Sequence, residues 1–149
     1  MPNAMRRSIF GRLVGIDDNG SFVGEARASE FTFAAAAGAA NVCNVTIQAI
    51  NYEGTSISGV KNLDLWLSDS ASGIGLTATT ASGTVTCTTG TDLFDFTAKK
   101  LKRVQTDATG KIVLEITDTA KTAFKVCYQP NSEVSGAKVG ITLAAGNYG

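Results

Sequence analysis

The chain contains no histidine, and its 149 residues include only 2 prolines, 3 cysteines and 1 tryptophan. Without histidine it lacks the side chain that most often serves as a general base or a metal ligand. A cysteine nucleophile also normally needs a histidine partner. No phosphate-binding loop, dinucleotide fingerprint or nucleophile elbow occurs in the sequence. We therefore expect a protein that is not an enzyme and that uses no metal or cofactor.

Long apolar runs are also missing. No segment reaches the roughly 18 uninterrupted apolar residues of a membrane-spanning helix. Arg6 and Arg7 resemble the start of a signal peptide, but Arg12 and Asp17 interrupt the stretch that would have to be its apolar core. We therefore expect no membrane partner and maturation in the cytosol, where thiols stay reduced.

Neither the charges nor the cysteines indicate a specialised site. Lysine plus arginine and aspartate plus glutamate number 13 each, so no net field attracts nucleic acid. Cys43, Cys87 and Cys127 lack metal-ligand spacing, and we expect them to be small buried side chains. As an alternative, Cys43 and Cys87 lie on facing sheets and pair when oxidised.

Residues 42–143 alternate between apolar and polar with period two, which is typical of half-buried strands. The pattern predicts an all-β chain whose sheets pack face to face. Seven segments show it most clearly, namely 42–50, 60–67, 83–89, 93–96, 111–117, 122–128 and 137–143. The apolar side chains that share a face within these segments are Cys43, Val45, Ile47, Ala49, Leu63, Leu65, Leu67, Val85, Cys87, Phe94, Phe96, Ile112, Leu114, Ile116, Phe124, Val126, Tyr128, Ala137, Val139, Ile141 and Leu143.

The first 40 residues follow a different pattern. Asn19-Gly20 lies between two apolar-bearing runs and predicts a β-hairpin of about 10–16 against 21–27. The alanine-rich run 34–40 contains Gly38 and has no amphipathic face, so we interpret it as an extended or flexible connector. A single helical turn is the alternative there. The predicted organisation is an arm, hairpin and connector over residues 1–40, followed by a sandwich over 41–149.

Two stretches of strand and turn residues, 45–69 and 105–129, resemble the bacterial Ig-like repeats of adhesins and the Ig-like modules of tailed-phage structural proteins. The second stretch contains Asp107-Ala108-Thr109-Gly110, a tight turn with glycine at its end. The resemblance covers residues 42–143 and implies an immunoglobulin-like β-sandwich. The chain departs from antibody domains at Trp66, which alternates out of phase with Leu63, Leu65 and Leu67 and is expected on the opposite face.

The Ala/Gly/Thr/Ser-rich stretches 65–83 and 141–149 are similar to those of phage structural proteins, and the whole chain resembles capsid decoration (cement) proteins. That resemblance implies a virion protein made in the host cytoplasm that binds between capsomers at the capsid surface and stabilises the mature head. It implies the major capsid protein or another virion protein as partner, and a homo-oligomer, either dimer or trimer. The alternatives are a tail, neck or head-fibre component and a carbohydrate-binding, adhesin-like module.

Three features carry side chains suited to binding a partner: the basic run 99–103, the N-terminal arm and Trp66. The run is expected to dock on an acidic surface, or else to be a solvated or edge strand protected by charge. The arm is expected to grip a neighbour, or else to be a frayed tail. Trp66 is either an interface anchor or a residue buried under the hairpin. The candidate interface residues are Arg6, Arg7, Ile9, Phe10, Arg12, Trp66, Lys99, Lys100, Lys102 and Arg103.

Overall fold

The computed structural model describes residues 4–7, 13–16, 22–23, 30–51, 53–130 and 137–149. Within these ranges every regular element is a β-strand except one short 3₁₀ turn, η1 (Ala145–Asn147). Among the described residues, no helix has the length and apolar character needed to cross a membrane.

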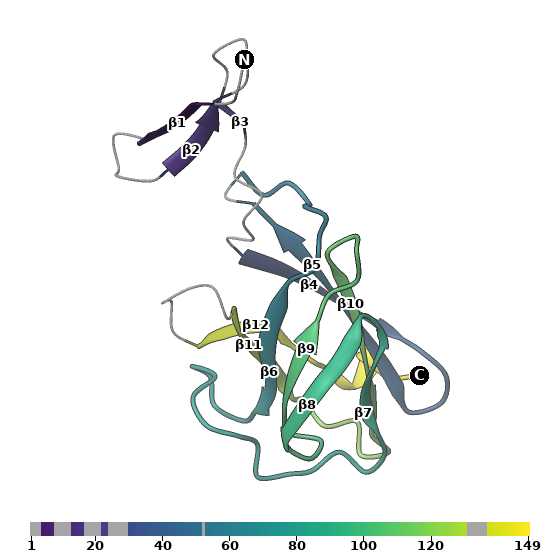
Figure 1. The fold of residues 1–149 in the computed structure, drawn as a ribbon. Helices are drawn as coiled ribbons and strands as arrows, with labels where there is room; N and C mark the ends of the chain where they lie inside the picture. The colour runs from purple at the N-terminus through teal and green to yellow at the C-terminus, as the bar shows by residue number, and fades with distance from the viewer. Residues whose placement is uncertain (1–3, 8–12, 17–21, 24–29, 52, 131–136) are drawn as a thin grey trace.

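Nine strands form two antiparallel sheets, an arrangement consistent with the β-sandwich that the alternation predicts (Figure 1). The four-stranded sheet contains, in spatial order, β4 (Glu30–Ala37), β5 (Val42–Ile50), β10 (Lys111–Thr117) and β7 (Val85–Thr89). The five-stranded sheet contains β12 (Lys138–Thr142), β11 (Lys125–Pro130), β6 (Asn62–Ser68), β9 (Leu101–Gln105) and β8 (Thr91–Thr97).

The core lies between these sheets, and the alternating pattern identifies most of it. Every second residue of β5, β6 and β10 is buried, as predicted. Each such large aliphatic side chain contributes about 1.5–3 kcal/mol by leaving water. The predicted core residues that the structure buries are Cys43, Val45, Ile47, Ala49, Leu63, Leu65, Leu67, Val85, Ile112, Leu114, Ile116, Phe124, Val126, Tyr128 and Leu143.

The alanine-rich run is a connector only at its end, because residues 34–37 belong to a strand and only residues 38–40 lie in the turn before β5. Residues 30–37 form β4, which pairs with β5 along its whole length, from Glu30 opposite Ile50 to Ala37 opposite Cys43. Phe31 is buried, and Phe33 packs against the core. Pairing with a long neighbouring strand satisfies the backbone, so it overrides the weak strand preference of alanine. The sheet therefore starts at Glu30 rather than at residue 41.

Two further expectations about the strands were wrong. Cys43 and Cys87 lie in the same sheet, on β5 and β7 with β10 between them, and all three cysteines are free. Of the side chains expected to point inward from the last strand, Leu143, just past β12, is buried and Ile141 packs against the core, but Ala137 is exposed and Val139 is only half-buried. A bulge in the β11–β12 pairing, between Val126 and Cys127, breaks the alternation there.

The side of the sandwich where β4 meets β12 is closed by aromatic rings. The centroid of the Tyr128 ring lies 5.8 Å from the centroid of the Phe31 ring and 4.9 Å from that of the Phe33 ring. A Cβ placed on Gly140 would lie 2.5 Å from the Phe33 ring. Glycine at this position therefore leaves room for the Phe33 ring next to the β12 backbone.

A third, smaller sheet lies near the N-terminus. It consists of β1 (Ala4–Arg7), β2 (Leu13–Ile16) and β3 (Phe22–Val23). Strands β2 and β3 pair antiparallel, with Gly15 opposite Val23 and Ile16 opposite Phe22. The Asn19-Gly20 turn lies outside the described residues. Strand β1 pairs with β2 where the sequence predicted an arm.

Candidate interface

The basic run does not form an exposed patch or an edge strand. β9, which contains its second half, lies between β6 and β8. Lys99 precedes β9 in a left-handed turn (φ 60°), and its Nζ donates to the Ala81 carbonyl oxygen at 3.4 Å. The Nζ of Lys100 donates to the carbonyl oxygens of Thr77 and Ala78 at 2.9 and 3.0 Å. Both lysines therefore hold the long β6–β7 connection in place.

Lys102 points into the molecule, and its side chain is only 5% exposed. Its Nζ lies 2.9 Å from Asp92 Oδ1 and 3.5 Å from Asp95 Oδ1, both on β8. The second Asp92 oxygen accepts the Cys87 backbone N–H at 3.0 Å. Burial raises the pKa of Asp92, but the hydrogen bonds from Cys87 and Lys102 more than offset this and lower it overall. Lys102 thus joins β9 to the edge strand and is not available to a partner.

Arg103, the next residue, points to the outer face of the five-stranded sheet. Its Nε and Nη2 donate to the two carboxylate oxygens of Asp64 at 2.8 and 3.0 Å. Its guanidinium carbon lies 5.3 Å from the centroid of the Phe96 ring, a cation–π contact. Because its side chain remains 42% exposed, Arg103 is paired yet accessible.

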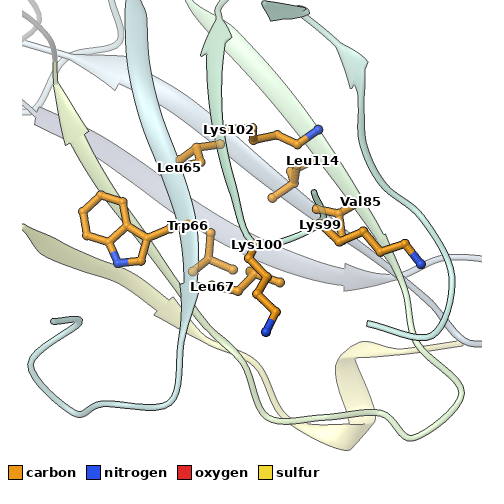
Figure 2. Close-up of a pocket in the computed structure, with 9 residues that line it drawn as sticks. Leu65, Trp66, Leu67, Val85, Lys99, Lys100, Lys102 and Leu114 are labelled. Atoms are coloured by element: carbon orange, nitrogen blue, oxygen red, sulfur yellow. The ribbon is translucent and has the colours of Figure 1, made fainter. Parts of the chain in front are cut away.

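Trp66 lies on the same outer face, opposite to Leu65 and Leu67, as the alternation predicts. Figure 2 shows its ring on one side of β6, away from Leu114 and Val85. The ring is half-buried, and its Nε1 donates to the Gly73 carbonyl oxygen at 2.8 Å. A loop of the sandwich itself therefore supplies this hydrogen bond and orients the indole.

Phe94 and Phe96 were expected to lie on the core face of their strand, but both are exposed. Phe94 and Phe96 on β8 are 59% and 48% exposed, and their ring centroids lie 5.0 Å apart. Bulges in the β8–β9 pairing, at Leu93 and at Phe96, allow Asp92 and Asp95 both to take inward positions beside Lys102. One signal in the sequence could have indicated this arrangement: two carboxylates, Asp92 and Asp95, precede a strand that contains Lys102, a cation with which both can pair.

The strand register places these outward side chains in two adjacent rows. Phe94 is opposite Arg103, which is opposite Asp64. In the next row Leu101 is opposite Trp66. Residues directly opposite in an antiparallel pair share a face. We call the resulting surface the aromatic face, and it consists of Asp64, Trp66, Phe94, Phe96, Leu101 and Arg103.

The composition of the aromatic face is typical of protein–protein contact surfaces. Aromatic residues and arginine are enriched in such interfaces, and lysine and glutamate are depleted. Tryptophan and arginine are also the residues that most often dominate binding energy. Of the predicted interface residues, Trp66 and Arg103 therefore come together on one surface, and Phe94 and Phe96 are added to them.

The predicted arm residues are placed only in part. Arg6 and Arg7 lie in β1, where their backbones pair with Val14 and Leu13. Ile9, Phe10 and Arg12 lie outside the described residues.

The cavity beside β6 and β9 is too small for a substrate or cofactor. It holds about 10 Å³ between Leu65, Val85, Lys102 and Leu114 (Figure 2). That volume is close to the minimum for one water molecule, whereas ligand pockets measure about 300–1,000 Å³. Among the described residues, no group of three His, Cys, Asp or Glu side chains is arranged to hold a metal ion.

No protein-family model matches the chain, and no curated protein matches it significantly.

Proposed function

We propose that this chain is a structural protein of a tailed-phage virion, a capsid decoration protein that binds between capsomers and stabilises the mature head. The observation that carries the proposal is the aromatic face: two exposed phenylalanines, a tryptophan and an accessible arginine on a rigid sheet. Such a surface suits a protein that works by contact with other proteins.

The order of the strands supports the Ig-like part of this proposal. Constant-type Ig domains place strands A, B, E and D in one sheet and G, F and C in the other. Here β4-β5-β10-β7 corresponds to the first set and β12-β11-β6 to the second. Strands β9 and β8 extend the second sheet beside β6. This extension supplies four of the six residues of the aromatic face, and β6 supplies Asp64 and Trp66.

The N-terminal segment supports attachment to a larger assembly. Its sheet has strands of 4, 4 and 2 residues. Strands this short give the sheet little surface to bury by itself, so packing on another protein would stabilise it. We propose that residues 1–23, including Arg6 and Arg7, bind the major capsid protein. Binding only the expanded shell would stabilise that state by mass action.

The test is binding of the purified protein to DNA-filled heads of the phage that encodes it, after the heads are stripped of the native copy. We expect saturable binding in many copies per head, counted by quantitative mass spectrometry. A variant that lacks residues 2–12 should bind at least about tenfold more weakly, a loss of about 1.4 kcal/mol. Low-copy binding at one vertex or on the tail would instead identify a neck, tail or fibre component.

A further inference from the structure

We propose that the aromatic face binds the aromatic face of a second copy of this chain, forming a dimer with two-fold symmetry. A two-fold contact uses the same patch on both partners, so the patch has to be complementary to itself. This inference rests on the same aromatic face as the proposed function. It assigns that face to contact between copies and leaves contact with the capsid to residues 1–23.

Charge is the first argument for a second copy as the occupant. The charged residues of the aromatic face are one cation, Arg103, and one anion, Asp64, which lie 2.8 Å apart. A strongly acidic or basic partner would need a binding face of the opposite charge. The aromatic face has no net charge, so it does not suit such a partner. A two-fold axis between Arg103 and Asp64 brings each Arg103 onto the Asp64 of the other copy. The chain itself has a formal net charge of +0, so two copies do not repel each other at long range.

The apolar side chains of the face are self-complementary in the same way. The Phe94 and Phe96 rings meet edge to face, with 79° between their planes, and they leave ring surface open to solvent. Arg103 already lies over the Phe96 ring within its own chain. In the dimer the same groups cover one another across the axis, and the cation–π contact strengthens as water leaves.

The contact uses side chains rather than addition of one edge strand to another. β8 is an edge strand, but bulges at Leu93 and Phe96 disturb the regular spacing of its edge N–H and C=O groups. The inward charges at Asp92, Asp95 and Lys102 are a second device that discourages strand addition. The two faces therefore pack against each other as sheets do in a sandwich.

The size of the face predicts a weak dimer. Three strands about 4.8 Å apart, with about 3.3 Å per residue, give a face of roughly 14 by 23 Å. Two such faces cover roughly 640 Å² in projection, which is the size of a weak, transient contact rather than of a stable interface. The dimer should therefore form at high protein concentration and dissociate on dilution.

Sedimentation velocity over protein concentrations from about 5 to 500 µM, in reducing buffer, tests this expectation. We expect the wild-type sedimentation coefficient to rise from the monomer toward the dimer value. Phe94→Asp should shift that transition to at least about tenfold higher concentration. Val60→Asp is the matched control, because Val60 is 54% exposed and is not part of the aromatic face. Both substitutions are at exposed positions, so thermal unfolding should show that the variants stay folded.

The proposal is overturned if the wild type stays monomeric over the whole range. It also fails if Phe94→Asp has no effect, or if Val60→Asp has an equal effect. A monomeric wild type would mean that the aromatic face binds a different protein. Either of the other two results would mean that the copies meet at another surface.

A pair of charge reversals tests the symmetry itself. Asp64→Arg gives the face two cations, and Arg103→Asp gives it two anions, so each variant alone should be monomeric. Mixed in equal amounts, the two variants should associate at least as well as the wild type, because each then presents the opposite charge to the other. A mixture no more associated than the separate variants would refute the reciprocal pairing. The capsid-binding test above uses a deletion of residues 2–12, so the two proposals fail independently.

Discussion

Lys102 and Arg103 are neighbours in the sequence, yet they have opposite environments. Lys102 is buried between Asp92 and Asp95, whereas Arg103 lies in the open on Phe96 and Asp64. Both are fully paired, and no buried side-chain nitrogen or oxygen of the described residues lacks a partner. Removing the buried Lys102 ammonium leaves the partly exposed Asp92 and Asp95 carboxylates close together without a cation, which costs more than losing an exposed ion pair.

Replacing Lys102 with alanine should therefore destabilise the protein by about 1–3 kcal/mol, since Asp92 and Asp95 would face each other without a cation. Lys138→Ala is the control, because the Lys138–Glu30 pair at 3.2 Å is exposed and its loss should cost less than about 1 kcal/mol. Urea unfolding of both variants gives the comparison. Equal losses would mean that Lys102 acts as a surface lysine.

Gly140 is the second position where one residue controls packing. Gly140→Ala places a methyl group 2.5 Å from the Phe33 ring and should cost about 1–3 kcal/mol, the usual range for overpacking a core. Gly146→Ala is the control, since no atom lies within 4 Å of the added carbon. If chemical denaturation gave the two variants the same stability, the Phe33–Gly140 contact would be wrong.

At the scale of the strand, position within a sheet determines whether buried and exposed residues alternate regularly. β5 and β6 are interior strands, and their alternation between buried and exposed residues is complete except at the end of β6. β8 is an edge strand, and all seven of its residues are exposed. A strand with one free edge can accept bulges, because only one ladder of hydrogen bonds has to be kept. That freedom allows β8 to turn its carboxylates inward and its phenylalanines outward.

The three cysteines lie on different strands, so the rate at which each thiol is labelled measures how often its strand opens to solvent. Burial raises the pKa of Cys43 and Cys127 to about 11 and that of Cys87 to about 12, so all three thiols stay protonated near neutral pH. Because the thiolate is the reactive form, labelling of the native protein by N-ethylmaleimide should be slow. We expect Cys87 on the edge strand β7 to be labelled before Cys43 on β5, since edge strands open at lower cost. Peptide mapping by mass spectrometry measures the order, and faster labelling of Cys43 would contradict it.

For the whole molecule, pH acts mainly through aspartates, because the chain has no histidine. Burial raises the pKa of Asp118, but hydrogen bonds from Thr122 and Ser82 lower it more, so its pKa lies below the ordinary 3.8. The pKa of Asp92 is lowered in the same way. A group whose pKa is lower in the folded state stabilises the fold above its unfolded pKa. That stabilisation disappears as pH falls through the folded pKa.

We therefore expect the free energy of unfolding to be nearly constant from about pH 5 to 7 and to fall below about pH 4. Asp118→Asn should lower stability at neutral pH and make the acid decline shallower, because one titrating group is lost. Urea unfolding between about pH 2 and 7 measures both effects. An unchanged acid slope in this variant would show that Asp118 contributes nothing to it.

The candidate site was only partly predictable at this scale. Trp66 was expected on the face opposite Leu65, and this was confirmed because alternation is a local property of one strand. Lys99 and Lys100 were assigned to a strand but lie in a turn, where their partners come from residues 77–81. Contacts of that kind join segments about 20 residues apart, and no local pattern encodes them.

The sequence by itself determined the all-β character of the chain and most of its core, because a period of two settles which side chains share a face. Only the tertiary structure decided that the alanines of β4 belong to a sheet, that Lys102 is internal, and that Phe94 and Phe96 are exposed. The physical reason is the same in each case. Whether a face meets solvent or protein depends on which strands pair with it, and a single bulge exchanges the two faces.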